Sequence, residues 1–155
     1  MTGKFKPCLD ILPPSQKRLW PELKNEKDVK VSFFGTITFG HVREPNFTED
    51  GVLLVASLED LMATKLKVVL QCAEAKDYRD VAAMITAGIS LSHGLASARQ
   101  LFGPNFQPSE SLKALVYFND GDLKTLTNVE KNTLIEAVAA VRDLPDVPPH
   151  LRHRF

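Results

Sequence analysis

Three charged side chains stand where two predicted helices should have apolar ones. Lys65 lies on the apolar stripe of the first helix, which is otherwise formed by Leu58, Leu61, Met62, Leu66 and Val69. Asp77 and Asp80, three residues apart in the next helix, share a face with the apolar residues of that helix. Because burying an unpaired charge is costly, such residues indicate a snorkelling side chain, a buried partner or a functional site.

The three residues could act together, because only a few residues separate the two helices. Asp77 and Asp80 lie near the start of their helix, where the helix dipole is positive, and a short turn would bring them beside Lys65. A lysine–aspartate cluster at the edge of a sheet could hold phosphate oxygens. A purely structural ion pair explains the same pattern, and the residues by themselves leave both interpretations open.

The elements that must position these residues are helices in the second half of the chain. We expect five of them, over residues 57–72, 75–87, 90–102, 109–118 and 127–142. Caps are expected at Ser57, Ser90, Ser109 and Thr127, and stops at Gly88 and Gly103. Ser57 with Asp60 and Thr127 with Glu130 have the spacing of capping boxes, and the second is the better match because it ends in glutamate.

The first part of the chain has a pattern typical of a small sheet. Residues 13–23 predict a short helix, and β-branched and aromatic residues predict strands at VKVSFF, TITFG and GVLLVA, with a polar loop, REPNFTED, before the last. The expected fold is α+β, a small three-stranded sheet followed by a helical bundle, in a single domain over residues 1–155. Residues 13–56 would form the short helix and the sheet, 57–142 the helical part, and 143–155 a proline-rich tail.

The composition limits the classes of function. Hydrophobic residues make up 44% and charged residues 25%, as in a globular domain with one core. Nineteen basic and nineteen acidic residues cancel, so the overall charge argues against binding to nucleic acid. No segment approaches the roughly 20 apolar residues that span a bilayer, so we expect no membrane partner and a cytoplasmic location. Cys8 and Cys72 lack the spacing of a zinc site, and both are expected to be free thiols, Cys72 a buried one.

The order ASLEDLMATKLKVVLQ followed by AEAKDYRDVAAMI resembles the second half of the nucleotidyltransferases of the AbiEii/AbiGii toxin family, from type IV toxin–antitoxin systems. The resemblance extends through SHGLASARQLFGPNFQPSESLKALVYF and returns at LDILPPSQKRLWPEL, so it covers most of the chain. It implies that Lys65 contacts a nucleotide phosphate, that Asp80 orients this lysine and that Asp77 is the aspartate of an RD pair. Lys76 stands where arginine is usual in that pair.

The catalytic metal-binding segment of that family has no counterpart in the sequence. Family members resemble polymerase-β-like enzymes, with a GS- or GG-type turn and a D-x-D pair that binds two metal ions. Between LWPEL and VKVSFF this chain has only KNEKD, and Ser32 stands where some relatives have a further carboxylate. Since Mg²⁺ needs carboxylates to hold it, the resemblance implies a truncated nucleotidyltransferase-like fold with a degenerate site and no cofactor. If the chain is active, Mg²⁺ and a nucleoside triphosphate are the expected cofactors.

Other groups in the sequence replace these carboxylates poorly. Acidic pairs that adjoin a glycine are interpreted as turns, namely Asp120 with Asp122 and Glu49 with Asp50. The two glycines of FFGTITFG lack the lysine of a P-loop and are interpreted as a hairpin. The histidines are interpreted as residues of a loop (His41) and of a solvated tail (His150 and His153) rather than as metal ligands.

Loss of a strand–helix unit would leave a sheet edge uncovered, and such edges pair with other chains. We therefore expect a homo-oligomer or a partner protein at that edge, such as a toxin–antitoxin partner or an intact paralogue.

Three functions stay open. The chain could be an inactive nucleotidyltransferase-like protein that acts by protein interaction. It could be an active Mg²⁺-dependent nucleotidyltransferase, modifying RNA or protein with metal ligands from another chain. It could also be a folded product of a decayed gene. The missing D-x-D pair favours the first.

Overall fold

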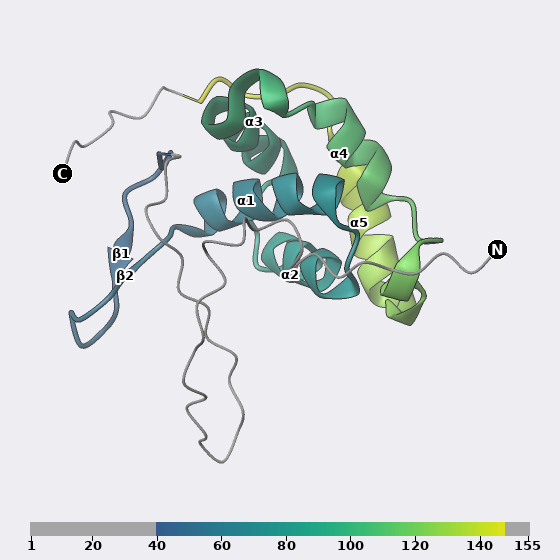
Figure 1. Ribbon diagram of the computed structural model, residues 1–155, viewed down its shortest axis with the longest axis horizontal. Coiled ribbons are helices and arrows are strands. Elements are labelled where there is room, and N and C mark those ends of the chain that lie inside the picture. Colours follow the sequence, from purple (N-terminus) through teal and green to yellow (C-terminus); the bar gives the residue numbers. More distant parts are fainter. Residues whose placement is uncertain (1–39, 148–155) are drawn as a thin grey trace, which may run out of the picture. The chain divides into compact units, whose positions relative to one another are not determined.

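The structure, a computed structural model, describes residues 40–147 (Figure 1). In chain order the elements are β1 (Asn46–Phe47), β2 (Leu54–Val55), α1 (Leu58–Gln71), α2 (Ala75–Thr86), α3 (Leu91–Phe102), the 3-10 helix η3 (Gly103–Asn105), α4 (Pro108–Leu115), the 3-10 helix η4 (Gly121–Thr125) and α5 (Asn128–Ala140). This part of the chain is a mixed α+β structure and is mostly helical. No helix within residues 40–147 combines the length and the apolar content needed to cross a bilayer.

Several expectations fall on residues outside the described range. They are the short helix at 13–23 and the strands at 29–34 and 36–40, together with Cys8, Ser32, His150 and His153. The three-stranded sheet and the single domain over the whole chain therefore stay predictions.

The helices begin and end close to where the local signals place them. The side chains of Ser57 and Ser90 cap α1 and α3, and Thr127 begins α5 with a complete capping box. Gly88 and Gly103 have φ values of 91° and 55°, a backbone conformation that favours glycine, and α2 and α3 stop beside them. The predicted helices over residues 57–142 are thus confirmed as elements.

The start of α4 differs from the prediction. The helix begins at Pro108, with Gln107 as its N-cap, and the side chain of Ser109 does not cap it. Proline at the first helical position has φ already set for a helix, and the N–H that it lacks would have had no partner there. α4 and α5 also end a few residues earlier than expected, at Leu115 and Ala140.

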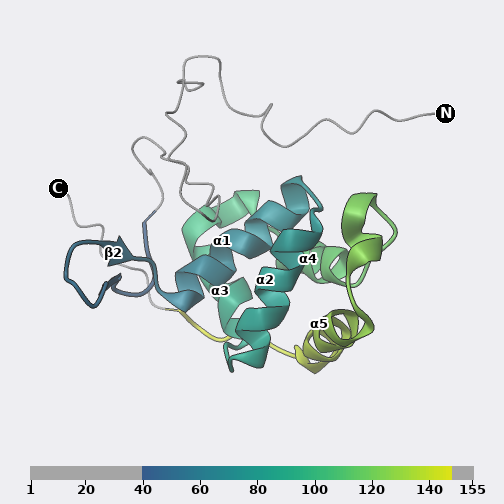
Figure 2. The same ribbon diagram turned by 90° about the horizontal axis from the view of Figure 1, so that it is seen from below.

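The core lies between α1 and the helices on either side of it. In the view of Figure 1, α1 crosses the centre with α3 above it and α2 below, and Figure 2 shows the same three helices packed together. The largest fully buried apolar side chains are Tyr78, Phe106, Met62, Leu66, Leu95, Leu115, Leu123, Leu134 and Val81. α1 and α3 approach closely at Gly94, where a Cβ atom would overlap Cγ of Met62. A larger residue at this position would force the side chain of Met62 to move.

The hairpin segment (residues 46–55) precedes the helices. Its strands β1 and β2 pair antiparallel. The strand predicted over residues 51–56 is confirmed only at β2, and β1 lies in the stretch that was predicted to be a polar loop. The polar stretch forms β1 because of the turn at the tip of the hairpin. There Thr48 and Leu53 exchange hydrogen bonds, and the chain folds back along β2. Alternation of apolar residues does not signal such a turn.

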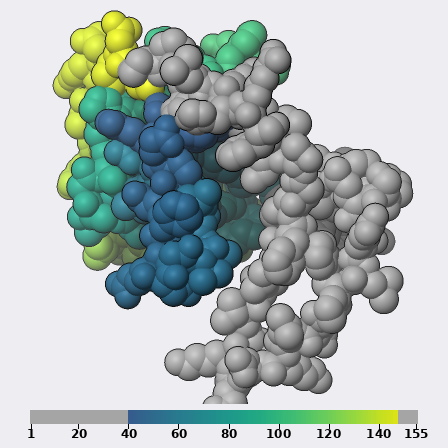
Figure 3. All heavy atoms as spheres, turned by 90° about the vertical axis from the view of Figure 1, so that its left-hand side faces the viewer, coloured from purple at the N-terminus to yellow at the C-terminus, as the bar shows by residue number. Residues whose placement is uncertain are grey.

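The hairpin segment exposes apolar side chains. Phe47 and the run Val52–Val55 are each between 50% and 72% exposed, and Thr48 is the one residue of the segment that is not classed as exposed. The two strands contact each other, and neither packs extensively on a helix of the described part. Figure 3 shows the segment, in dark blue, at the surface of the molecule.

Cys72 differs from the expectation of a buried free thiol. It is partly exposed, and it is not a free cysteine. It lies at the C-cap of α1, past the last buried position of that helix, Val69, which explains why the core does not cover it.

Candidate functional site

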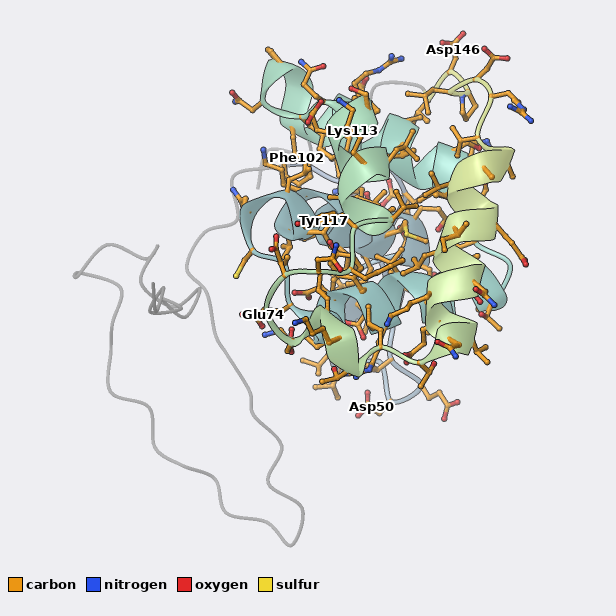
Figure 4. The ribbon with its side chains drawn as sticks, turned by 90° about the vertical axis from the view of Figure 1, so that its right-hand side faces the viewer. Asp50, Glu74, Phe102, Lys113, Tyr117 and Asp146 are labelled. Carbon is orange, nitrogen blue, oxygen red and sulfur yellow. The ribbon has the colours of Figure 1, made fainter. Side chains whose placement is uncertain are left out.

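The three charged residues that the sequence singles out meet where α1 and α2 join. Asp77 lies in the first turn of α2, just after the turn that contains Glu74, which is labelled in Figure 4. Nζ of Lys65 is 2.7 Å from Oδ1 of Asp77 and 2.6 Å from Oδ2 of Asp80. The short turn does bring both carboxylates to the lysine. We refer to Lys65, Asp77 and Asp80 as the lysine triad.

The members of the lysine triad differ in burial. Asp77 is 3% exposed, whereas the side chains of Lys65 and Asp80 are 22% and 49% exposed. The expectation that both aspartates point inward therefore holds for Asp77 and is wrong for Asp80. Residues three apart on a helix differ by about 60° around its axis, which is enough to move one of them off the edge of a buried stripe. The lysine triad thus runs from the core to the surface.

The electrostatics keep Lys65 charged. Burial on its own lowers the pKa of Lys65, but the hydrogen bonds and negative charges of Asp77 and Asp80 outweigh it, so the pKa lies above its ordinary value. With both carboxylates ionised, one positive and two negative charges leave the lysine triad with a net negative charge. Two of the three N–H donors of the ammonium are directed at carboxylates.

The neighbouring basic residues of α2 have other partners. Lys76, which the resemblance places in the RD-type pair, forms an ion pair with Glu74 on the surface. Arg79 faces away from the lysine triad. It donates hydrogen bonds to the carbonyl oxygen and to Oγ1 of Thr125, at 3.1 and 2.9 Å, and its Nε lies 3.4 Å from Glu130. Arg79 therefore links α2 to η4 and α5 and does not add positive charge to the lysine triad.

One carboxylate of each acidic pair next to a glycine accepts a backbone hydrogen bond. Oδ1 of Asp122 accepts the backbone N–H of Ala75 at 2.8 Å and so satisfies an amide at the start of α2. Asp120 is the N-cap of η4. Asp50 accepts hydrogen bonds from Thr48 and from the amide of Val52 in the hairpin turn, which lowers its pKa. Glu49 and Asp50 lie in the hairpin turn, as interpreted from the sequence, whereas Asp122 lies in the 3-10 helix η4 and not in a simple turn.

Residues that could hold a metal do not cluster in the described part. Within residues 40–147 no three histidine, cysteine or acidic side chains are grouped as a metal site would need. His41 lies 3.8 Å from one neighbouring carboxylate, that of Glu44. Lys67, two residues after Lys65 in α1, reaches the carbonyl oxygen of Asn105 and lies over the ring of Phe102.

One buried carboxylate was not recognised as important from the sequence. Asp60, expected to act only as part of a weak capping box, is 6% exposed and binds residues far from it along the chain. Its Oδ1 accepts the amide of Val42 at 2.7 Å, and its Oδ2 accepts the amide of Arg43 at 3.2 Å and the hydroxyl of Ser57 at 2.9 Å. An aspartate at the third position of a helix is common, so no local signal distinguishes this one.

Comparison with protein-family models gives no match for this chain, and comparisons with curated proteins and with solved structures give no significant match. The family resemblance and the roles that it implies for Lys65, Asp77 and Asp80 therefore stay predictions.

Proposed function

We propose that this chain is a nucleotidyltransferase-like protein of the AbiEii toxin type that lacks the metal-binding motif and acts by protein interaction rather than by catalysis. One observation carries the proposal. The ammonium of Lys65, which the family resemblance assigns to a nucleotide phosphate, is already held by two carboxylates at 2.7 and 2.6 Å.

Charge explains why this arrangement argues against catalysis. A phosphate-binding site stabilises negative charge, so its donors must be available and its net charge should be positive. The lysine triad has one donor left and a net negative charge, so it would repel a triphosphate unless a cation entered with it. It suits a structural role instead: the buried carboxylate of Asp77 is neutralised, and α1 is fastened to α2.

The hairpin segment supports interaction with a second copy of this chain. Its exposed apolar run Val52–Val55 is the type of surface that another chain can cover. The formal net charge of the chain is zero at pH 7, so two copies would not repel each other. The predicted strands at 29–34 and 36–40 belong to the same proposal, as further members of a three-stranded sheet.

A second function is favoured by the exposure of the lysine triad. The side chain of Asp80 is 49% exposed, so a nucleotide and Mg²⁺ arriving from solvent could reach it. In this alternative, Lys65 binds the triphosphate, Asp77 and Asp80 orient the lysine, and another chain supplies the carboxylates that hold Mg²⁺.

Nucleotide transfer separates the two functions. The purified chain is incubated with each labelled nucleoside triphosphate, Mg²⁺ or Mn²⁺, and total RNA or cell protein, beside Asp80→Asn and the control Lys67→Ala. Asp80→Asn is preferred to Lys65→Ala, because losing Lys65 leaves the buried Asp77 unpaired and should cost about 3 kcal/mol of stability. We expect no transfer by any of the three. Transfer by wild type and Lys67→Ala, but not by Asp80→Asn, would establish the enzyme.

Sedimentation tests the interaction. Wild type should associate as its concentration rises, and Leu54→Lys, which places a charge on the exposed strand, should weaken that association without changing the melting temperature. A wild-type chain that stays monomeric at high concentration would disprove self-association.

A further inference from the structure

The carboxylate of Asp60 joins two parts of the chain that are separated by the hairpin segment. Successive amides, those of Val42 and Arg43, donate to its two oxygens, Oδ1 at 2.7 Å and Oδ2 at 3.2 Å. Oδ2 also accepts the hydroxyl of Ser57 at 2.9 Å, and that hydroxyl in turn accepts the amide of Asp60 at 3.1 Å. The chain entering the hairpin segment and the chain leaving it are thus bound to one buried side chain.

Within residues 40–147, the two capping sequences with capping-box spacing, at the starts of α1 and α5, use their carboxylates differently. At the start of α5, the side chain of Glu130 turns back to the backbone N–H of Thr127 and completes a capping box. Ser57 and Asp60 have the same spacing at the start of α1, but the structure records no such return bond there. The oxygens of Asp60 serve a distant segment instead.

The hairpin segment has few other attachments to the helical part. Neither β1 nor β2 packs extensively on a described helix, and the apolar side chains of the segment are exposed. Close to Asp60, Arg43 and Glu59 form a long ion pair of 4.0 Å between partly exposed side chains, which contributes little. Charge-assisted hydrogen bonds to a buried carboxylate are stronger than those between neutral groups.

We propose that Asp60 is a positioning residue, a carboxylate clamp that fixes the base of the hairpin segment on the first turn of α1. The clamp holds the exposed strand in one orientation relative to the helices. Its importance for self-association rests on the proposed function, whereas its effect on the hairpin segment does not.

Amide hydrogen exchange measured by NMR at low protein concentration tests the clamp alone. The variant is Asp60→Asn, whose side chain has one acceptor oxygen in place of two. The matched control is Glu59→Gln, which removes the same charge from the same helical turn. We expect the amides of Val42 and Arg43 to exchange about tenfold faster or more in Asp60→Asn, with smaller increases through the hairpin segment. Unchanged exchange at Val42 and Arg43 would overturn the proposal, and so would an increase spread evenly over α1, α2 and α3.

Sedimentation of the same variants tests the positioning role. If wild type associates, Asp60→Asn should associate about tenfold more weakly than Glu59→Gln, at an unchanged melting temperature of the helices. Equal dissociation constants would overturn the positioning role. If wild type stays monomeric, self-association is wrong, and hydrogen exchange alone decides whether the clamp exists.

Discussion

The helical part and the hairpin segment are made of similar residues but are stabilised in different ways. Leu66 in α1 is fully buried, whereas Leu54 in β2 is 54% exposed. The helices are fixed by a shared core, and the lysine triad adds an ion cluster at the junction of α1 and α2. The hairpin segment is fixed by its turn and by hydrogen bonds to the carboxylate of Asp60.

This difference shows which part of the chain can change its conformation while the rest stays folded. A segment with few buried apolar contacts opens at a lower free energy than the core around it. The hairpin segment can therefore respond to a partner, while the helical part keeps its structure. A continuous run of exposed apolar side chains, Val52–Val55, lies in the region that the fold depends on least.

The largest difference in stability should come from the same kind of substitution, leucine to alanine, made once in each region. Leu66→Ala removes fully buried carbon atoms from the contact of α1 with its neighbours and should lower the free energy of unfolding by about 2–5 kcal/mol. Leu54→Ala should lower it by less than about 0.5 kcal/mol. Urea denaturation followed by circular dichroism measures both values. Similar losses for the two variants would show that the hairpin segment belongs to the core.

Alkaline pH should weaken the helical part through Tyr78. Burial, with a smaller effect from Asp120, raises the pKa of Tyr78 to about 12, and its hydroxyl donates to the carbonyl oxygen of Ala114 at 3.0 Å. The unfolded chain loses this proton near pH 10 and the folded chain does not, so the free energy of unfolding should fall as the pH rises from about 10 to 12. The contribution is on the order of 2 kcal/mol.

The measurement compares urea denaturation at pH 9 and pH 11. Tyr78→Phe should show a smaller fall than wild type, and Tyr117→Phe, which removes a half-exposed phenol, is the control. Lys65 acts in the same direction, because its raised pKa favours the folded state until the pH passes through that value. Comparing Tyr78→Phe with wild type cancels this contribution. Equal falls in both proteins would contradict the assignment to Tyr78.

Alanine substitutions at two glycines, Gly94 and Gly51, should change the stability by smaller and unequal amounts. Gly94→Ala forces Met62 to move and brings Cδ1 of Leu66 within 3.3 Å of the new Cβ atom. Overpacking of about 1–3 kcal/mol, offset by the better helix propensity of alanine, gives a net loss of about 1 kcal/mol. Gly51→Ala meets no neighbour within 4 Å but strains a backbone with φ of 68°. It should leave the melting temperature of the helices unchanged. A fall in melting temperature as large as that of Gly94→Ala would show that the hairpin turn and the core unfold together.

Local signals were sufficient to place most helix ends. The caps at Ser57, Ser90 and Thr127 act on amides within three residues, so they can be recognised in the sequence without knowledge of the fold. The same holds for the glycine stops at Gly88 and Gly103. α4 begins at Pro108 and not after Ser109, because a proline at the first helical position is a local start signal of its own.

Contacts between distant residues could not be predicted in this way. Asp122 accepts a hydrogen bond from the amide of Ala75, and Asp60 accepts hydrogen bonds from the amides of Val42 and Arg43. The residues next to these aspartates in the sequence do not indicate either contact. The hairpin was predicted in part, because β1 consists of two residues within a polar stretch. Strand pairing depends on where the partner lies, which periodicity within one segment does not encode.

The sequence by itself determined the helices, their caps and the presence of charge on two apolar faces, because these follow from side chains that lie within one or two turns of each other. Only the tertiary structure decided that Lys65 binds both Asp77 and Asp80, that Asp77 is buried while Asp80 reaches the surface, and that Asp60 holds the base of the hairpin segment. Burial and charge pairing depend on which surfaces meet when the helices pack, and that information is spread over the whole core.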